Sequence, residues 1–111
     1  MTLRSFGRAV PIQMNMLALV GYEFAERDLR PATGLNARKR AMMSGLHSLK
    51  KATGADFAYD AAAWRDFLIE AGEEFGYTHS YAYKTVDSAV RKALSNQDVI
   101  DALALMSNPD G

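Results

Sequence analysis

The chain has 111 residues, of which 49% are hydrophobic and 23% charged, with 13 basic residues, 13 acidic residues and no cysteine. This length predicts one domain that buries its core without metal or disulfide support, and the composition is that of a globular protein. The lack of cysteine excludes a disulfide framework and thiolate chemistry, and it suits a reducing cytoplasm.

The first ten residues alternate too poorly for an assignment, so we expect an irregular arm or a short strand over 1–10. Two arginines and the apolar run 14–20 only partly imitate a signal peptide, because Pro11 and Asn15 interrupt the pattern. The run is also far shorter than the ~20 residues that cross a bilayer. We therefore expect a cytoplasmic protein that does not bind a membrane.

Pro11 is typical of the first turn of a helix, and the pattern that follows predicts a helix over 12–29, ended by Pro31. Its apolar side chains recur at helical spacing, as in Leu17, Val20 and Phe24. A helix that is apolar on most sides is usually central. Gly21 would weaken it by roughly 1 kcal/mol unless another helix crosses closely there. Such a helix is also the basis of one alternative hypothesis, a self-associating structural subunit that forms a homo-oligomer.

A second helix is predicted over 36–53 and a third over 60–75. Gly54 suits the left-handed position after the second helix, and Asp60 can cap the third. The apolar line of the second helix is Met42, Leu46 and Leu49. The buried face of the third is predicted to be Trp64, Phe67, Leu68, Ala71 and Phe75.

The connection between these two helices and the start of the third has a characteristic sequence pattern, Thr53-Gly54-x-Asp56-Phe57-x-Tyr59-Asp60-x-x-x-Trp64-Arg65-x-Phe67-Leu68. This run resembles the close of a HEAT-type helical hairpin, as in bacterial HEAT-repeat proteins and some immunity proteins of contact-dependent growth inhibition systems. Ala58 stands where glycine is more typical, and the chain holds no second copy of the run. The resemblance implies one HEAT-like central hairpin with antiparallel helices, because a solenoid needs repeated units.

A fourth helix is predicted over 79–94, capped by Thr78 or Ser80, and a fifth over 97–107. The inward side chains of the fourth helix are expected to be Tyr83, Val86, Val90 and Leu94. Asn108 and Pro109 end the last helix and leave a loose tail over 108–111. We expect a single all-α domain over 1–111, a compact bundle of four to five helices with short loops.

Charge is unevenly distributed along the chain. Residues 27–51 hold seven basic residues against one acidic, whereas residues 56–101 hold nine acidic against four basic. The third helix carries a stripe of carboxylates: Asp66, Glu70 and Glu73, with Glu74 beside them. Such a stripe is either a solvated face or a surface that attracts a basic partner. The leading hypothesis is a non-catalytic protein-binding module. The resemblance implies an immunity protein that neutralises a toxin.

The rival hypothesis is a helix-turn-helix DNA-binding regulator of phage or plasmid type. In residues 69–86 Gly72 lies four before Gly76, and a second helix follows. That helix would present to a major groove Thr78, His79, Ser80, Tyr81 and Lys84. The basic cluster Arg38, Lys39 and Arg40 would hold phosphates. Against this, Ala82 occupies a position where such motifs place a branched apolar residue, and the carboxylates would repel phosphate. Salt bridges from the basic cluster to the helix over 60–75 are the simpler expectation.

Catalysis is not expected. The two histidines, His47 and His79, are far apart and lie in no metal-ligand spacing. The glycines form no phosphate-binding loop. We therefore expect no enzyme activity, no metal and no cofactor.

Overall fold

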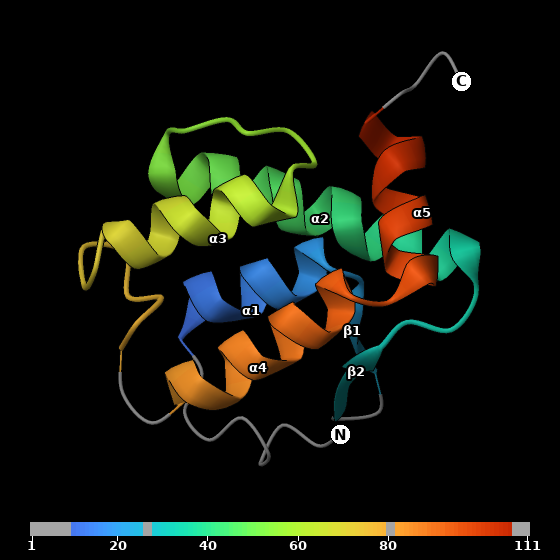
Figure 1. Ribbon diagram of the computed structural model, residues 1–111, viewed down its shortest axis with the longest axis horizontal. Helices are drawn as coiled ribbons and strands as arrows, with labels where there is room; N and C mark the ends of the chain where they lie inside the picture. Colours follow the sequence, from blue (N-terminus) through green and yellow to red (C-terminus); the bar gives the residue numbers. More distant parts are fainter. Residues whose placement is uncertain (1–9, 26–27, 80–81, 108–111) are drawn as a thin grey trace.

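The computed structural model describes residues 10–25, 28–79 and 82–107, so the predicted tail and all but Val10 of the predicted arm lie outside it. These residues form five helices and a two-stranded antiparallel sheet (Figure 1). In chain order the elements are α1 (Pro11–Leu19), β1 (Tyr22–Ala25), β2 (Asp28–Pro31), α2 (Leu35–Thr53), α3 (Ala61–Glu70), α4 (Ala82–Leu94) and α5 (Gln97–Ser107). The predicted helical bundle is confirmed, with a small β-ribbon added to it.

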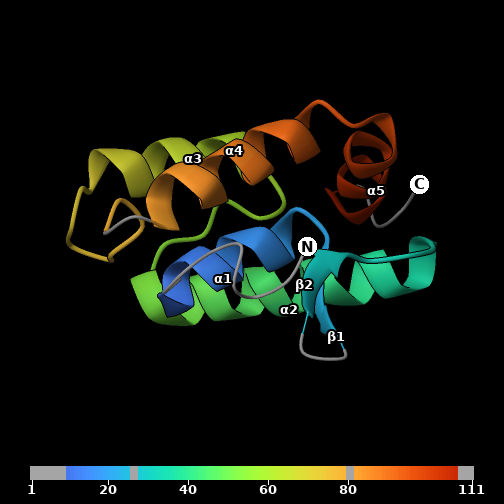
Figure 2. The same cartoon turned by 90° about the horizontal axis from the view of Figure 1, so that it is seen from below.

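Helix α1 is the centre of the fold. Figure 2 shows α1 and α2 in one layer and α3 and α4 in the other, with α5 at one end against α2 and α4. The side chains of Met16, Leu17 and Leu19 are fully buried because α1 packs against α2, α3 and α4. These side chains belong to the core, so they offer no apolar face for the self-association hypothesis.

The predicted helix over 12–29 is wrong in its second half. Pro11 does begin α1, but the helix ends at Leu19, and Gly21 turns the chain at a φ of 97°. The chain then forms a ribbon in which Tyr22 pairs with Pro31 and Glu23 with Arg30. Apolar residues on all sides fit a buried helix and a ribbon equally well, so periodicity alone did not separate the two. The turn glycine and the aromatic residues after it favour the strand.

A close helix crossing, the condition under which Gly21 would be tolerated in a helix, occurs instead at Gly45 of α2. A β-carbon there would collide with the backbone nitrogen of Leu19 and lie 2.8 Å from the carbonyl carbon of Ala18. The absence of a side chain therefore lets the backbones of α1 and α2 meet. The predicted apolar line of α2 is confirmed, since Met42 and Leu49 are fully buried and Leu46 partly so.

The connection from α2 to α3 has the predicted caps. Gly54 has a φ of 74°, and the Asp60 carboxylate accepts a hydrogen bond from the Ala63 backbone N–H at 3.0 Å. Trp64 is fully buried, and its ring lies 5.0 Å from that of Phe57, edge to face. Its indole N–H donates to the Ala58 carbonyl at 2.9 Å. The aromatic anchor expected from the sequence is therefore present.

The direction of α3 differs from the expectation. Residues 54–60 run back along the molecule, so α2 and α3 point the same way in both views and are not an antiparallel hairpin (Figures 1 and 2). Helix α1 contacts both of them. Seven residues of extended chain cover about 23 Å, which is enough to span the ~15 Å length of α3. The capping residues Gly54 and Asp60 predict where α2 ends and α3 begins, but they do not predict the path of the chain between the two helices.

Candidate functional site

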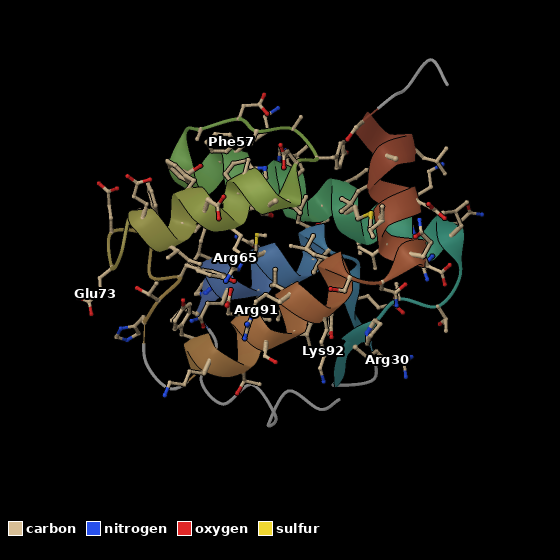
Figure 3. All side chains as sticks on the ribbon, in the orientation of Figure 1. Arg30, Phe57, Arg65, Glu73, Arg91 and Lys92 are labelled. Atoms are coloured by element: carbon tan, nitrogen blue, oxygen red, sulfur yellow. The ribbon has the colours of Figure 1, made fainter. Side chains whose placement is uncertain are left out.

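The predicted acidic stripe becomes a surface made of a helix end and a turn. Asp66 and Glu70 lie on α3, but the helix ends at Glu70, so Glu73 and Glu74 belong to the turn after it. The helix predicted over 60–75 is thus too long, because Gly72 adopts a φ of 64°. All four carboxylates are exposed, and Glu73 points away from the molecule in Figure 3. We call these four residues the acidic surface.

The acidic surface is not neutralised by any side chain that the structure describes. Among the residues that the structure describes, no cation lies within ion-pair distance of Asp66, Glu70, Glu73 or Glu74. The surface therefore retains its negative charge for a partner in solution.

The turn that carries Glu73 and Glu74 is held on the core. Tyr77 is fully buried, and its hydroxyl donates to the Asp87 carboxylate at 3.0 Å. The Gln13 side-chain amide of α1 donates to the backbone carbonyls of Tyr77 at 2.8 Å and His79 at 3.1 Å. Phe75 packs on Phe67 with 5.6 Å between ring centroids. These contacts place the carboxylates on a fixed support, which lowers the entropy cost of binding.

Asp87 is the centre of a charged network that sequence reasoning missed. The Arg65 guanidinium donates to both carboxylate oxygens of Asp87, at 2.6 and 2.9 Å, and Arg91 lies 3.4 Å away (Figure 3). The Arg65 hydrogen bonds hold the pKa of Asp87 below its ordinary value. Burial, followed by the nearby Asp87 charge, raises the pKa of Tyr77. The signal in the sequence was an aspartate placed next to Val86 on the inward side of the helix. The network joins α3 to α4.

The residues of the helix-turn-helix hypothesis are not brought together as that motif requires. Residues 71–79, nine in number, all lie outside a helix after Glu70, whereas the motif uses a turn of about three or four residues. The fourth helix begins at Ala82 and not at 79, so Thr78 and His79 precede it. Ser80 and Tyr81 lie outside the described residues. Lys84 is exposed on α4.

The predicted salt bridges from the basic cluster to the third helix are wrong. Arg38, Lys39 and Arg40 lie in the first turns of α2, and no carboxylate within the described ranges pairs with them. The reason is the direction of α3, which brings the start of α2 near α5 instead. Lys50 alone of the α2 cations forms an ion pair in the described part of the chain, with Asp56 at 3.4 Å.

Neither a metal site nor a membrane-spanning helix is present among the described residues. No group of three His, Asp or Glu side chains there could hold a metal ion, and His47 and His79 are both exposed. No helix in that part of the chain has the length and apolar character needed to cross a bilayer.

Comparisons with protein-family models, curated proteins and solved structures find no match to this chain. The HEAT-like resemblance of residues 53–68 therefore stays a prediction.

Proposed function

We propose that this protein is a non-catalytic protein-binding module whose acidic surface binds a basic face of another protein. The observation that carries the proposal is the set of four exposed carboxylates, Asp66, Glu70, Glu73 and Glu74, without an ion-pair partner in the described residues. Their anchored turn supports it, because a fixed array of charge steers a partner and selects its orientation.

The partner that the resemblance suggests is a toxin, which the protein would neutralise as an immunity protein in the cytoplasm. Toxins that act on nucleic acids carry basic clefts, and a negative surface can occupy such a cleft in place of phosphate. The lack of cysteine in the whole chain suits a reducing compartment.

The experiment is a binding titration against the product of any toxin-like reading frame that neighbours this gene. Wild-type protein is expected to bind, with an affinity that falls as salt is added. Glu70→Gln/Glu73→Gln is expected to weaken binding at least about tenfold, because each carboxylate contributes to steering and to charge pairing. The matched control is Asp98→Asn/Asp101→Asn, which removes two exposed carboxylates from α5 and is expected to bind as wild type.

Equal loss of affinity in the two double variants would assign the effect to overall charge and would remove the acidic surface from the proposal. Failure of the wild-type protein to bind, together with normal growth of a deletion strain beside toxin-bearing rivals, would overturn the immunity role.

A further inference from the structure

Two adjoining hollows lie along α4 on the surface. The first, of about 320 Å³, is lined by Tyr22 and by one face of α4: Lys84, Thr85, Ser88, Ala89 and Lys92. The second, of about 140 Å³, lies between the end of α4, β1 and the start of α2, and its polar side chains include Arg38, Lys92 and Asn96. Tyr22 and Lys92 line both hollows, so together they form one groove. We call it the donor groove.

The side chains of the donor groove are suited to an anion. They offer two ammonium groups, one guanidinium, two aliphatic hydroxyls, the phenol of Tyr22 and an amide, and no carboxylate of the described residues lines either hollow. Lysine and arginine can only donate hydrogen bonds, and hydroxyl and amide groups can donate as well. The hollow beside α1 differs in this respect, because Glu23 and Arg40 both line it.

The three cations of the groove are not neutralised by the described side chains around them. Among the described residues Arg38, Lys84 and Lys92 form no ion pair. The acid nearest in sequence on α4, Asp87, is already occupied by Arg65, Tyr77 and Arg91. Lys92 follows Arg91 directly but points away from that network (Figure 3). The positive charge of the groove therefore remains open to a partner.

The spacing of the cations favours a chain of anions over a single one. Lys84 and Lys92 are eight residues apart on α4, which places them about 12 Å apart along the helix axis. The hydroxyls of Thr85 and Ser88 lie between them, and Arg38 extends the groove beyond Lys92. One strand of a duplex advances ~3.4 Å along the duplex axis per phosphate, so the array, laid parallel to that axis, spans a run of about four nucleotides.

We infer that the donor groove binds the phosphate backbone of nucleic acid. Cations interleaved with Ser, Thr and Asn side chains are the groups that proteins use for phosphate and sugar contacts. Contacts of this kind position a protein on nucleic acid without reading its bases. The inference shares Lys84 and Arg38 with the helix-turn-helix hypothesis but needs no such motif. It is separate from the acidic surface, which lies on α3 and the turn after it.

The test is fluorescence anisotropy of the full chain with a labelled DNA duplex of about 20 base pairs, between about 50 and 200 mM salt. Wild-type protein is expected to bind with a log–log salt slope of about −3, one phosphate for each cation. Lys84→Gln/Lys92→Gln is expected to reduce the magnitude of that slope by about 2 and to weaken binding at least about tenfold at the lower salt.

Single variants separate a groove from a general charge effect. Lys92→Gln should weaken binding and Lys92→Arg should preserve it. Lys51→Gln removes the same charge from an exposed site at the far end of α2 and should bind as wild type. Lys51, Lys84 and Lys92 are all exposed, so the variants are expected to fold as wild type. Circular dichroism checks this.

Three results would overturn the inference: no binding at the lower salt, equal losses from Lys51→Gln and Lys92→Gln, or tighter binding to polyglutamate or anionic vesicles than to DNA. Glu70→Gln/Glu73→Gln should not weaken DNA binding. Failure here therefore leaves the proposed protein-binding role untouched, and the reverse also holds.

Discussion

Ala58 holds a backbone conformation that suits glycine. Its φ is 50°, the only positive value at a non-glycine residue within the described ranges. A β-carbon in this region costs roughly 1–2 kcal/mol. The conformation persists because Asp56 accepts the Ala58 N–H at 2.8 Å and Trp64 donates to its carbonyl. This is the position at which the resembling HEAT-type run has glycine.

Ala58→Gly is expected to stabilise the protein by about 0.5–1 kcal/mol, because relief of the strain exceeds the extra entropy of the unfolded chain. Urea unfolding measures the change. Ala104→Gly, at an exposed position inside α5, is the control and should destabilise by about 1 kcal/mol. A destabilising Ala58→Gly would show that the Asp56 and Trp64 hydrogen bonds depend on the alanine.

Asp87 makes the stability of the protein depend on pH. Its pKa is lowered in the folded state, so its contribution is complete above the ordinary value of 3.8 and is lost as pH falls through the lower folded value. Asp87→Asn leaves the Arg65 charge without its partner, which should cost about 2–4 kcal/mol at pH 7. Urea unfolding should show this deficit shrinking as pH falls below 3.8, the ordinary pKa of Asp87. A deficit that is constant with pH would contradict the ionic role of Asp87.

At the scale of elements, the crossing of α1 and α2 depends on one glycine. Gly45→Ala should destabilise by about 2–3 kcal/mol, because the added methyl meets the backbone of α1 at Leu19 and Ala18. This loss would occur although alanine favours a helix by about 1 kcal/mol over glycine. Ser44→Ala, the exposed neighbour, is the control and should change stability by less than about 0.5 kcal/mol. Thermal unfolding followed by circular dichroism distinguishes the two, and a neutral Gly45→Ala would mean that the helices separate without cost.

At the scale of the whole molecule, the central position of α1 predicts a single cooperative transition. Three other helices pack on α1, so each of them loses core contacts when α1 unfolds. Fluorescence of Trp64, the only tryptophan, and circular dichroism of the helices should give the same urea midpoint. Leu17→Ala, in the centre of α1, should lower both midpoints together and cost about 3 kcal/mol. A fluorescence transition that precedes loss of helix would show that α3 opens separately.

The sequence by itself determined the local features of this protein. Gly54, Asp60 and Pro11 act within a few residues of themselves, so the ends they form were predictable, and the last helix was predicted over its full length. The tight turn at Gly21 is local too, but it was not predicted, because the apolar residues on both sides of it also fit a continuous helix.

Only the tertiary structure decided which distant residues meet. The path of 54–60 sets the direction of α3, pairs Arg65 with Asp87 across 22 residues, and leaves Arg38 of α2 beside α4 and α5. Such pairings depend on the mutual fit of buried surfaces, which no short stretch of sequence contains.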